Sequence, residues 1–449
     1  MRKPNKKGFT IVELVIVIAV IAILAAVLIP TFVSVTRKAN ESNDVQAARN
    51  MNTFLAAAKV TDEVDSILDV YDIFEDSGYS VENYKPLYAG RHYYYDKQYN
   101  QIVYVNEEDG KIIYPAEHKG EAKNDHDWFS LSMSVAKTEK PAVFTDANNV
   151  ITATATTTEE YAYVIEQYNN KGGNLDLTIT GNVDLMGATC AIKETKGNIT
   201  IKGESAENPV VIKNVTSNSQ LDTGVVHNAE GVKADYYAGG IITKINTGNV
   251  VFENVVFENI HVKTPTVGGA GIVVGQMSNK TGTLTLNNVT LKNSSVIGHR
   301  DVGALVGAMQ GGPKVIFDGK VALENVKVKT TGGRSGLVIG KVIASDSCSV
   351  KFESGADLII NNSDMSIYND KNLEQKFASG DTVPAEWGTI SPTKIEGQDQ
   401  FIYSYKGLKD GKKGYSVYGY KAGALVIVQN GDAWTAITDL TEFKKGVNV

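Results

Sequence analysis

The sequence predicts an α+β N-terminal part, made of one long helix and a small antiparallel sheet, followed by a mainly-β solenoid of stacked parallel strands. Three observations support this prediction. They are an unbroken apolar run from Leu14 to Ile29, three aromatic and β-branched runs between residues 91 and 114, and a glycine-bracketed apolar segment that recurs after residue 238. A chain of 449 residues exceeds the usual size of one compact domain, about 150 residues, so several parts are expected.

The apolar run begins the longest predicted helix. Residues 14–29 are all Leu, Val, Ile or Ala, and at ~1.5 Å per residue a helix over residues 9–30 can cross a bilayer core of ~30 Å. Glu13 is the exception in this segment, because an ionised carboxylate inside an apolar helix costs on the order of a few kcal/mol unless it meets a counter-charge. We therefore expect a transmembrane segment at residues 9–30 in which Glu13 needs a positively charged partner.

The segment Lys-Gly-Phe-Thr-Ile-Val-Glu-Leu at residues 7–14 resembles the processing site of type IV pilins and pseudopilins. The resemblance implies that prepilin peptidase cuts between Gly8 and Phe9, so that residues 1–8 are a leader and Phe9 becomes the methylated N-terminus. It also implies that Glu13 is the assembly glutamate. Its charge would be matched by the Phe9 ammonium of a neighbouring subunit in the low-dielectric core of a fibre.

Two alternatives for this N-terminus are a cleaved secretory signal and a plain signal anchor. A cleaved signal has an apolar core of only ~7–15 residues before a small-residue cut site, whereas this run is longer and continues into a polar helix. A signal anchor shares the positively charged leader, which would hold the N-terminus in the cytoplasm. It does not explain why Gly8 and Glu13 occur together.

Pro30 matches the helix-weakening proline of pilins, because a proline inside a helix removes one hydrogen bond and usually bends the helix. Beyond Pro30 the helix is predicted to continue in amphipathic form to residue 60. Its apolar face for packing comprises Ala39, Val45, Ala48, Met51, Leu55 and Ala58. A second helix is predicted over residues 62–76 from the same period.

A small head is predicted at residues 61–116. The aromatic and β-branched runs predict strands over residues 91–95, 101–106 and 111–114. Asp109-Gly110 marks the turn between the last two of these strands. This region resembles the heads of pilin-like proteins from Gram-positive bacteria. The polar residues 117–155 have no steady period and predict a connector with a strand or two.

Near residue 156 the sequence changes from an irregular polar segment to regular helix and strand patterns. Thr156 to Glu160, followed by apolar residues at helical spacing, predict a capped helix that ends near Gly172-Gly173. Short strands are predicted over residues 175–179, 182–185, 199–203 and 210–212. This order resembles the start of right-handed parallel β-helix proteins, in which the helix would seal the open end of the stack. The β-helix is expected over residues 156–372, and residues 373–449 are expected to form its last strands or a small β cap.

An internal repeat favours the stack. Segments around Gly240, Gly271, Gly303 and Gly336 align at separations of 31, 32 and 33 residues, and each unit contains about three strands. The glycines are expected at corners that other residues resist. An Asn at the same place in each unit predicts one ladder of side-chain amides, formed by Asn254, Asn288, Asn325 and Asn362.

Motifs of catalysis and metal binding are missing from the sequence. It contains no zinc signature, P-loop, dinucleotide fingerprint or nucleophile elbow. The most tempting cluster is Gly-His-Arg-Asp at residues 298–301, but a glycosidase needs a second carboxylate ~5–10 Å away. The aligned residues 265–268 and 329–332 supply none. We therefore predict no enzymatic activity, no cofactor and no metal site; a pilin-anchored polysaccharide-cleaving β-helix enzyme remains the alternative.

The formal net charge is −7 and positive charge is concentrated in the leader, so the sequence gives no indication of a nucleic-acid partner. The cysteines and a cluster of tyrosines each leave two alternatives open. Cys190 and Cys348 either form a disulfide or remain as two buried thiols. A tyrosine cluster either binds sugars or forms the core of the small sheet; it comprises Tyr93, Tyr94, Tyr95, Tyr99 and Tyr104.

Together these features predict a pilin or pseudopilin subunit with an adhesive β-helix domain. The precursor would lie in the cytoplasmic membrane with its N-terminus inside, and the assembled subunit would be exposed on a pilus at the cell surface. The resemblance implies prepilin peptidase, other pilin subunits, a platform protein and an assembly ATPase as partners, and the displayed domain would bind a surface glycan or protein. So large a head predicts a minor subunit. Twitching, adhesion, DNA uptake and type II secretion are not distinguished.

Overall fold

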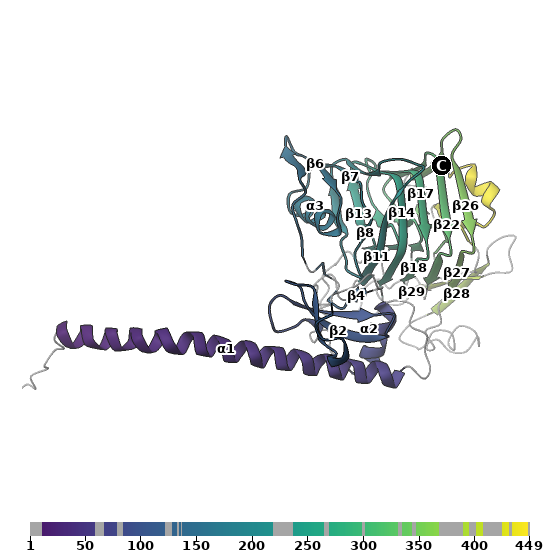
Figure 1. The fold of residues 1–449 in the computed structure, drawn as a ribbon. Helices are drawn as coiled ribbons and strands as arrows, with labels where there is room; N and C mark the ends of the chain where they lie inside the picture. The colour runs from purple at the N-terminus through teal and green to yellow at the C-terminus, as the bar shows by residue number, and fades with distance from the viewer. Residues whose placement is uncertain are drawn as a thin grey trace, which may run out of the picture. The chain divides into compact units, whose positions relative to one another are not determined.

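A computed structural model describes residues 11–58, 67–78, 84–121, 128–132, 134–135, 137–218, 237–264, 269–298, 301–330, 335–343, 347–367, 389–394, 401–406, 424–430 and 433–447. The chain divides into two compact units: Met1–Glu63 with Ile73–His126, and Val64–Asp72 with Asp127–Val449. The first unit contains a long helix and a small antiparallel sheet, and the second is mostly β with several sheets (Figure 1).

The long helix α1 (Ile11–Ala58) begins the first unit and continues without a break through Pro30. Near its C-terminal end, three residues are buried, with side chains at most 2% exposed, as their helical spacing predicts; they are Ala48, Met51 and Leu55. Ala39 was predicted on the same face but is exposed. The reason is geometric: Ala39 lies nine residues before Ala48, which is two and a half turns at ~3.6 residues per turn and therefore the opposite side of the helix.

The small sheet agrees with the sequence prediction. Its strands are β1 (Arg91–Asp96), β2 (Gln101–Asn106) and β3 (Lys111–Tyr114), antiparallel in the order β3-β2-β1. The short 3-10 helix η2 (Ala116–His118) follows, and α2 (Ile67–Asp76) precedes the sheet. Residues 62–66 of the predicted second helix lie outside the described residues.

The tyrosines of this sheet form its core. Tyr93, Tyr94, Tyr95 and Tyr104 are at most 1% exposed, and the rings of Tyr93 and Tyr104 lie 5.3 Å apart. Tyr99, in the turn between β1 and β2, is 42% exposed. The core interpretation of the tyrosine cluster is therefore correct for four of its five members.

The second unit begins with β4 (Trp128–Ser130), a hairpin and a capped helix. The antiparallel hairpin joins β5 (Val143–Ala147) to β6 (Val150–Ala155), within the segment predicted as a connector, and β6 pairs in parallel with β7 (Asn174–Ile179). Helix α3 (Thr158–Lys171) starts at the predicted place. Thr157 and Glu160 form a capping box, and Gly172 ends the helix at a φ of 71°.

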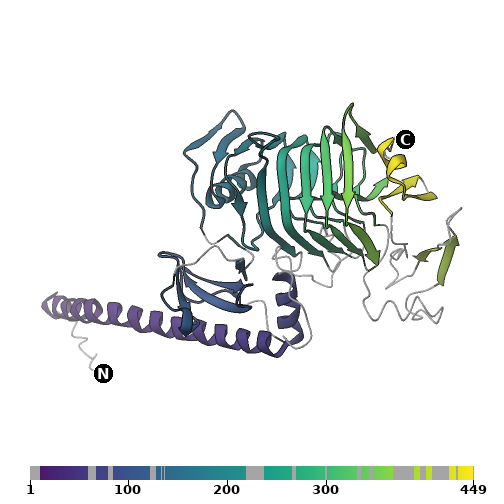
Figure 2. The ribbon, with the colours of Figure 1, turned by 45° about the vertical axis from the view of Figure 1, so that its right-hand side comes forward.

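Parallel strands from successive repeat units lie side by side (Figure 2). One path runs β7-β10-β14-β17-β21-β25, and a second runs β9-β13-β16-β20-β24-β30. Shorter pairings join β8-β11-β14, β17-β22-β26, β14-β18-β23-β27 and β12-β15-β19. The bounds are β8 (Val183–Asp184), β9 (Ile192–Lys196), β10 (Ile199–Gly203), β11 (Val210–Asn218), β12 (Ala238–Gly239), β13 (Ile242–Thr247), β14 (Asn249–Thr264), β15 (Ala270–Gly271), β16 (Val274–Met277), β17 (Thr283–Lys292), β18 (Ser295–Gly298), β19 (Val302–Gly303), β20 (Val306–Met309), β21 (Lys314–Phe317), β22 (Lys320–Glu324), β23 (Lys327–Thr330), β24 (Ile339–Ile343), β25 (Ser349–Phe352), β26 (Asp357–Asn361), β27 (Asp364–Ile367) and β30 (Val426–Asn430).

Inward-facing side chains of these strands form one continuous apolar core. Every second residue is buried along strands such as β7 and β10. Equivalent positions stack; Val250, Leu284 and Val315 are paired neighbours and each is fully buried. Burying each such side chain stabilises the fold by about 1.5–3 kcal/mol. A slip of one residue would turn the apolar set outward, which makes the register strongly specified.

The glycine repeat is in a different register from the sequence alignment. Gly239, and not Gly240, pairs with Gly271, which in turn pairs with Gly303, at a constant spacing of 32 residues. Two adjacent glycines left the alignment ambiguous by one position. The following apolar residues resolve it, because Ile242 pairs with Val274 and Val274 with Val306.

Asparagines at the strand corners form two rows, whereas the sequence predicted one ladder. In the first row, Asn288 donates its amide to Asn254 at 3.2 Å. In the second, Asn325 donates to Asn293 at 3.1 Å and Asn362 donates to Asn325 at 3.4 Å. The single ladder was therefore wrong in its membership. Two units have asparagines five residues apart, Asn254 with Asn259 and Asn288 with Asn293, and the pairing of Glu324 with Lys292 places Asn325 in the second row.

Hairpins and a helix follow at the C-terminal side. A separate hairpin joins β28 (Thr389–Lys394) and β29 (Phe401–Lys406), and β31 (Ala433–Ile437) pairs antiparallel with β30. Helix α6 (Leu440–Lys444) places the buried Phe443 against the edges of the Phe317 and Phe352 rings, 6.2 and 5.9 Å away. Residues 373–449, which were expected to form the last strands or a cap, thus supply one more strand of the stack, β30, and a helix that packs against its end, α6.

Candidate functional site

The candidate site is the N-terminal half of α1. Gly8 and Phe9, the predicted processing residues, lie outside the described residues. Glu13, the predicted assembly residue, belongs to the first turn of the described helix, and its side chain is outside the description. Pro30 lies inside the helix. The predicted kink at Pro30 stays a prediction.

This part of the helix exposes its apolar side chains. Every large apolar side chain that is described between Ile11 and Val35 is at least 43% exposed, and Phe32 reaches 73%. A contiguous apolar surface of this length is unfavourable in water, since each Å² exposed costs about 25 cal/mol. The helix therefore requires an apolar environment, either lipid or other apolar helices.

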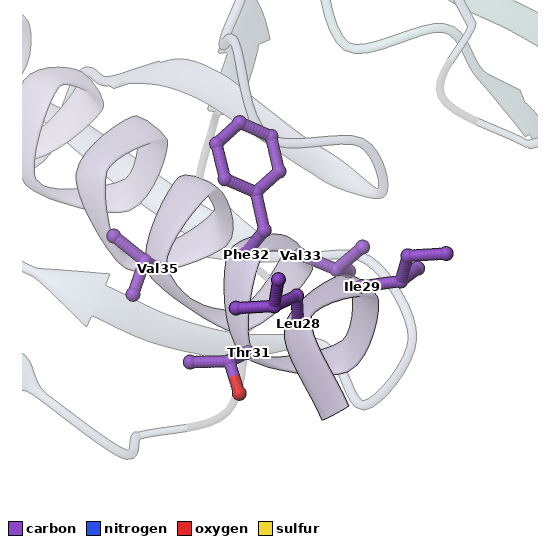
Figure 3. Close-up of a pocket in the computed structure, with 6 residues that line it drawn as sticks. All are labelled: Leu28, Ile29, Thr31, Phe32, Val33 and Val35. Atoms are coloured by element: carbon purple, nitrogen blue, oxygen red, sulfur yellow. The ribbon is translucent and has the colours of Figure 1, made fainter. Parts of the chain in front are cut away.

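The apolar surface extends beyond the segment that the sequence predicted. Figure 3 shows the side chains of Leu28, Ile29, Phe32, Val33 and Val35, which precede and follow Pro30 in the sequence. Pro30 has no N–H to donate to the preceding turn, so the helix loses a hydrogen bond in the middle of this surface. From Ile11 to Val35 the helix is about 37 Å long at ~1.5 Å per residue, longer than a bilayer core of ~30 Å.

Among the described helices, α1 is the one long and apolar enough to cross a membrane. A family model for the prokaryotic N-terminal methylation motif matches residues 3–29, a span that contains Gly8, Phe9 and Glu13. The major component of the type IV wide pilus of Thermus thermophilus, PilA4, is 60% identical over 38 residues. The N-terminal region is type IV pilin-like.

The pilin-like match is confined to the start of the chain. The 38 residues are 8% of this chain and 29% of PilA4. The major component of the type IV narrow pilus of the same organism, PilA5, is 44% identical over 54 residues, which are 12% of this chain and 47% of PilA5. The chain thus spans less than half the length of either relative. No solved structure matches it. The motif and the long apolar helix fit a membrane-anchored precursor.

The pilin-like helix is joined to the small sheet through Asp44, a residue that belongs to none of the sequence motifs described above. Asp44 is 2% exposed, and its carboxylate accepts hydrogen bonds from the backbone N–H groups of Leu87 and Tyr88 at 2.8 and 3.0 Å. The Tyr104 hydroxyl also donates to this carboxylate, at 2.9 Å, and the Tyr93 hydroxyl donates to the Asp44 carbonyl at 2.9 Å. One helix residue thereby orders a loop and two strands.

A sequence signal for Asp44 existed. It lies four, seven and eleven residues before Ala48, Met51 and Leu55, which places its carboxylate on the buried face of the helix. Burial is also the main reason why the pKa of Tyr104 is raised far above its usual value, followed by its hydrogen bond to Asp44. Tyr104 therefore remains a neutral donor to the carboxylate throughout the physiological pH range.

Asn52 makes a second connection between α1 and the sheet. Its amide nitrogen donates to the Ile102 carbonyl at 3.0 Å, and its amide oxygen accepts from the Ile102 N–H. β3 pairs with β2 only as far as Tyr114 opposite Tyr104. The Asn52 side chain thus satisfies backbone groups where a neighbouring strand has ended, and this fixes the helix along the sheet.

The cluster at residues 298–301 does not form a described catalytic site. His299 and Arg300 lie outside the described residues, and Asp301 is buried in an ion pair with Lys341 at 3.2 Å. Within the described ranges, no group of three His, Cys, Asp or Glu side chains is placed to hold a metal ion. Cys190 and Cys348 are free thiols, and burial raises the pKa of Cys190 to about 12.

Proposed function

We propose that this protein is the precursor of a type IV pilin or pseudopilin subunit. Prepilin peptidase would cut between Gly8 and Phe9 and methylate Phe9, and the subunit would assemble with other pilins through α1. The observation that carries the proposal is the exposed apolar surface of α1, which begins within the matched methylation motif. This surface suits both lipid before assembly and other apolar helices afterwards.

Assembly would depend on Glu13. Cleavage creates an ammonium group on Phe9, and in the low-dielectric interior of a helical bundle this ammonium offsets the charge of Glu13 from a neighbouring subunit. The pair is available only between processed subunits, so it would couple cleavage to incorporation. An assembly ATPase and a membrane platform protein would be the further partners.

The second unit would be the displayed, adhesive part. Parallel pairing of successive repeats, with a helix at the start and another at the end, supports a right-handed parallel β-helix. Such a domain offers a long, rigid surface for a glycan or protein ligand. Its size relative to the helix supports a minor subunit, because the same bulk on every protomer would crowd a thin fibre.

We further propose that the protein is not an enzyme. The one acid of the tempting cluster, Asp301, is 5% exposed and paired with Lys341, which removes it from general acid or base work at a surface groove. An activity screen of the full chain on plant and bacterial glycans tests this, and release of oligosaccharides would contradict it.

The test of assembly is the substitution Glu13→Gln in cells that produce surface fibres. We expect the variant to be cleaved after Gly8, as mass spectrometry of the mature N-terminus would show, but to be absent from sheared fibres. Glu41→Gln, on the same helix beyond the apolar surface, is the matched control and should enter fibres normally. Normal incorporation of Glu13→Gln would overturn the proposed role of the glutamate.

Immunogold labelling of fibres from the unmodified strain tests the subunit's abundance. A minor subunit predicts sparse labels along the fibre or labels restricted to its end. Dense labelling along the whole shaft would contradict the minor role while leaving pilin-type assembly intact.

A further inference from the structure

A lysine and an aspartate from neighbouring repeat units meet inside the second unit. Lys341 lies in β24, and Asp301 lies immediately before β19. The Lys341 Nζ is 3.2 Å from the Asp301 Oδ2, and the two side chains are 6% and 7% exposed. Buried lysines and aspartates are rare, so a pair of them needs a physical explanation.

The residues that flank Lys341 in the sheet are apolar and buried. The residues paired with Lys341 on its two sides, Ala308 and Ile427, are each 2% exposed. A Cβ on Gly340 would lie 2.6 Å from the Val302 nitrogen and 2.7 Å from the Asp301 carbonyl carbon. Only glycine permits this approach, so the backbone at Gly340 packs closely against the backbone at Asp301 and Val302, next to the residue that carries the lysine side chain.

Other lysine–acid pairs of the same unit provide a comparison. Lys213 lies 3.2 Å from Asp184, and Lys292 lies 3.2 Å from Glu258. Their separation equals that of the buried pair, but their side chains are between 27% and 37% exposed. These are ordinary surface ion pairs of successive strands. Burial, and not distance, distinguishes Lys341 and Asp301.

We propose that Lys341 and Asp301 are joined by an intramolecular isopeptide bond. Burial takes both groups out of water, and the transfer of one proton from Nζ to Oδ2 would leave an amine beside a carboxylic acid. These neutral forms are the reactive ones, since the amine lone pair is a nucleophile and the carboxylic acid is an electrophile. Fixed proximity replaces the encounter of two separate reactants.

The reaction is a condensation that needs no further reactant. The Lys341 Nζ attacks the Asp301 Cγ and forms the new C–N bond. One carboxyl oxygen then leaves as water, with a proton that came from the nitrogen, and the product is a neutral secondary amide. Both buried charges disappear, and no oxidant or reductant is consumed.

The bond would link two neighbouring repeat units covalently. Strand pairing alone allows such units to separate under force or during local unfolding. The free thiols Cys190 and Cys348 form no disulfide that would prevent this. An amide link between β24 and the residue before β19 would instead hold the units together irreversibly, in oxidising and reducing surroundings alike.

Mass spectrometry of the full-length precursor, produced in cells without prepilin peptidase and purified in detergent, tests the proposal. We expect the intact mass to be lower than the sequence mass by one water molecule. After trypsin digestion, residues 301–314 should remain joined to residues 335–351, because an acylated Lys341 is not cleaved. Peptides containing Lys213 and Lys292 should be linear and serve as internal controls.

Two variants make the result specific. Lys341→Arg keeps the positive charge but should show the full sequence mass, and Asp301→Asn should lose ammonia in place of water. An unmodified chain at the full sequence mass would overturn the proposal and identify the pair as a plain buried salt bridge. A loss of water that persists in Lys341→Arg, or that maps to other peptides, would overturn it equally.

Discussion

Single side chains decide how the helix of the first unit meets its sheet. The buried carboxylate of Asp44 accepts from two backbone N–H groups and from the Tyr104 hydroxyl. A buried acceptor shared by three donors is costly to remove, because each donor is left without a partner and without water. Asp44 therefore fixes the positions of Leu87, Tyr88 and Tyr104 relative to the helix.

Asp44→Ala is expected to destabilise the first unit by at least about 2 kcal/mol, since it leaves buried donors unsatisfied. The amides of Leu87 and Tyr88 should lose their protection in hydrogen–deuterium exchange of the full chain. Tyr104→Phe removes a single donor and should cost about 1 kcal/mol. Gln46→Ala, exposed on the same helix, is the control; unchanged exchange in Asp44→Ala would refute the role given to the carboxylate.

At the scale of elements, asparagines in a left-handed conformation occur within or directly after the parallel strands and change the direction of the backbone there. Seven of them in the described repeats have φ between 46° and 58°; they are Asn214, Asn254, Asn259, Asn288, Asn293, Asn325 and Asn362. Asparagine tolerates this left-handed conformation better than other residues with a side chain. Its amide then bonds to the equivalent amide of an adjacent unit, so conformation and register are specified by one residue type.

Asn325 offers a way to separate these two contributions. Asn325→Ala should destabilise the second unit by about 2–3 kcal/mol, from left-handed strain of ~1–2 kcal/mol and the lost amide bonds. Asn325→Gly keeps the conformation and loses only the amide bonds to Asn293 and Asn362, so it should cost about 1 kcal/mol. Thermal unfolding of both variants measures their stability. Equal losses of stability in the two variants would show that left-handed strain does not contribute to the effect of Asn325→Ala.

At the scale of the second unit, the stack of parallel strands needs closed ends. On the N-terminal side the β5–β6 hairpin and α3 end the sheet, and Tyr161, Val164 and Ile165 of α3 are buried. On the C-terminal side Phe443 of α6 contacts Phe317 and Phe352, whose rings are stacked at 4.3 Å. Covered ends keep exposed strand edges from pairing with other molecules.

Phe443→Ala is expected to open the C-terminal end. Loss of this fully buried ring should cost about 3–5 kcal/mol of local stability and expose the Phe352 ring. We expect increased binding of a hydrophobic dye and concentration-dependent association in sedimentation experiments. Val143→Ala, which truncates an apolar side chain of the second unit that is already 56% exposed, is the matched control. A Phe443→Ala chain that neither binds more dye nor associates would contradict a capping role.

Local patterns were sufficient where a signal repeats along the chain. The apolar run predicted α1, the aromatic runs predicted β1 to β3, and Thr157 with Glu160 predicted the start of α3, because each depends on residues close in sequence. The methylation motif was recognisable for the same reason. These features need no knowledge of what packs against them.

Tertiary structure alone decided which distant residues meet. The sequence placed four asparagines in one ladder and aligned Gly240 with Gly271. The alignment was ambiguous because two units have asparagines five residues apart and one unit has two adjacent glycines, Gly239 and Gly240. Packing of the apolar core selected the register that pairs Gly239 with Gly271 and Asn325 with Asn293. It also brought Asp44 to Leu87, and Lys341 to Asp301, since the partners of a buried charged group lie far away in sequence even where periodicity indicates which face is buried.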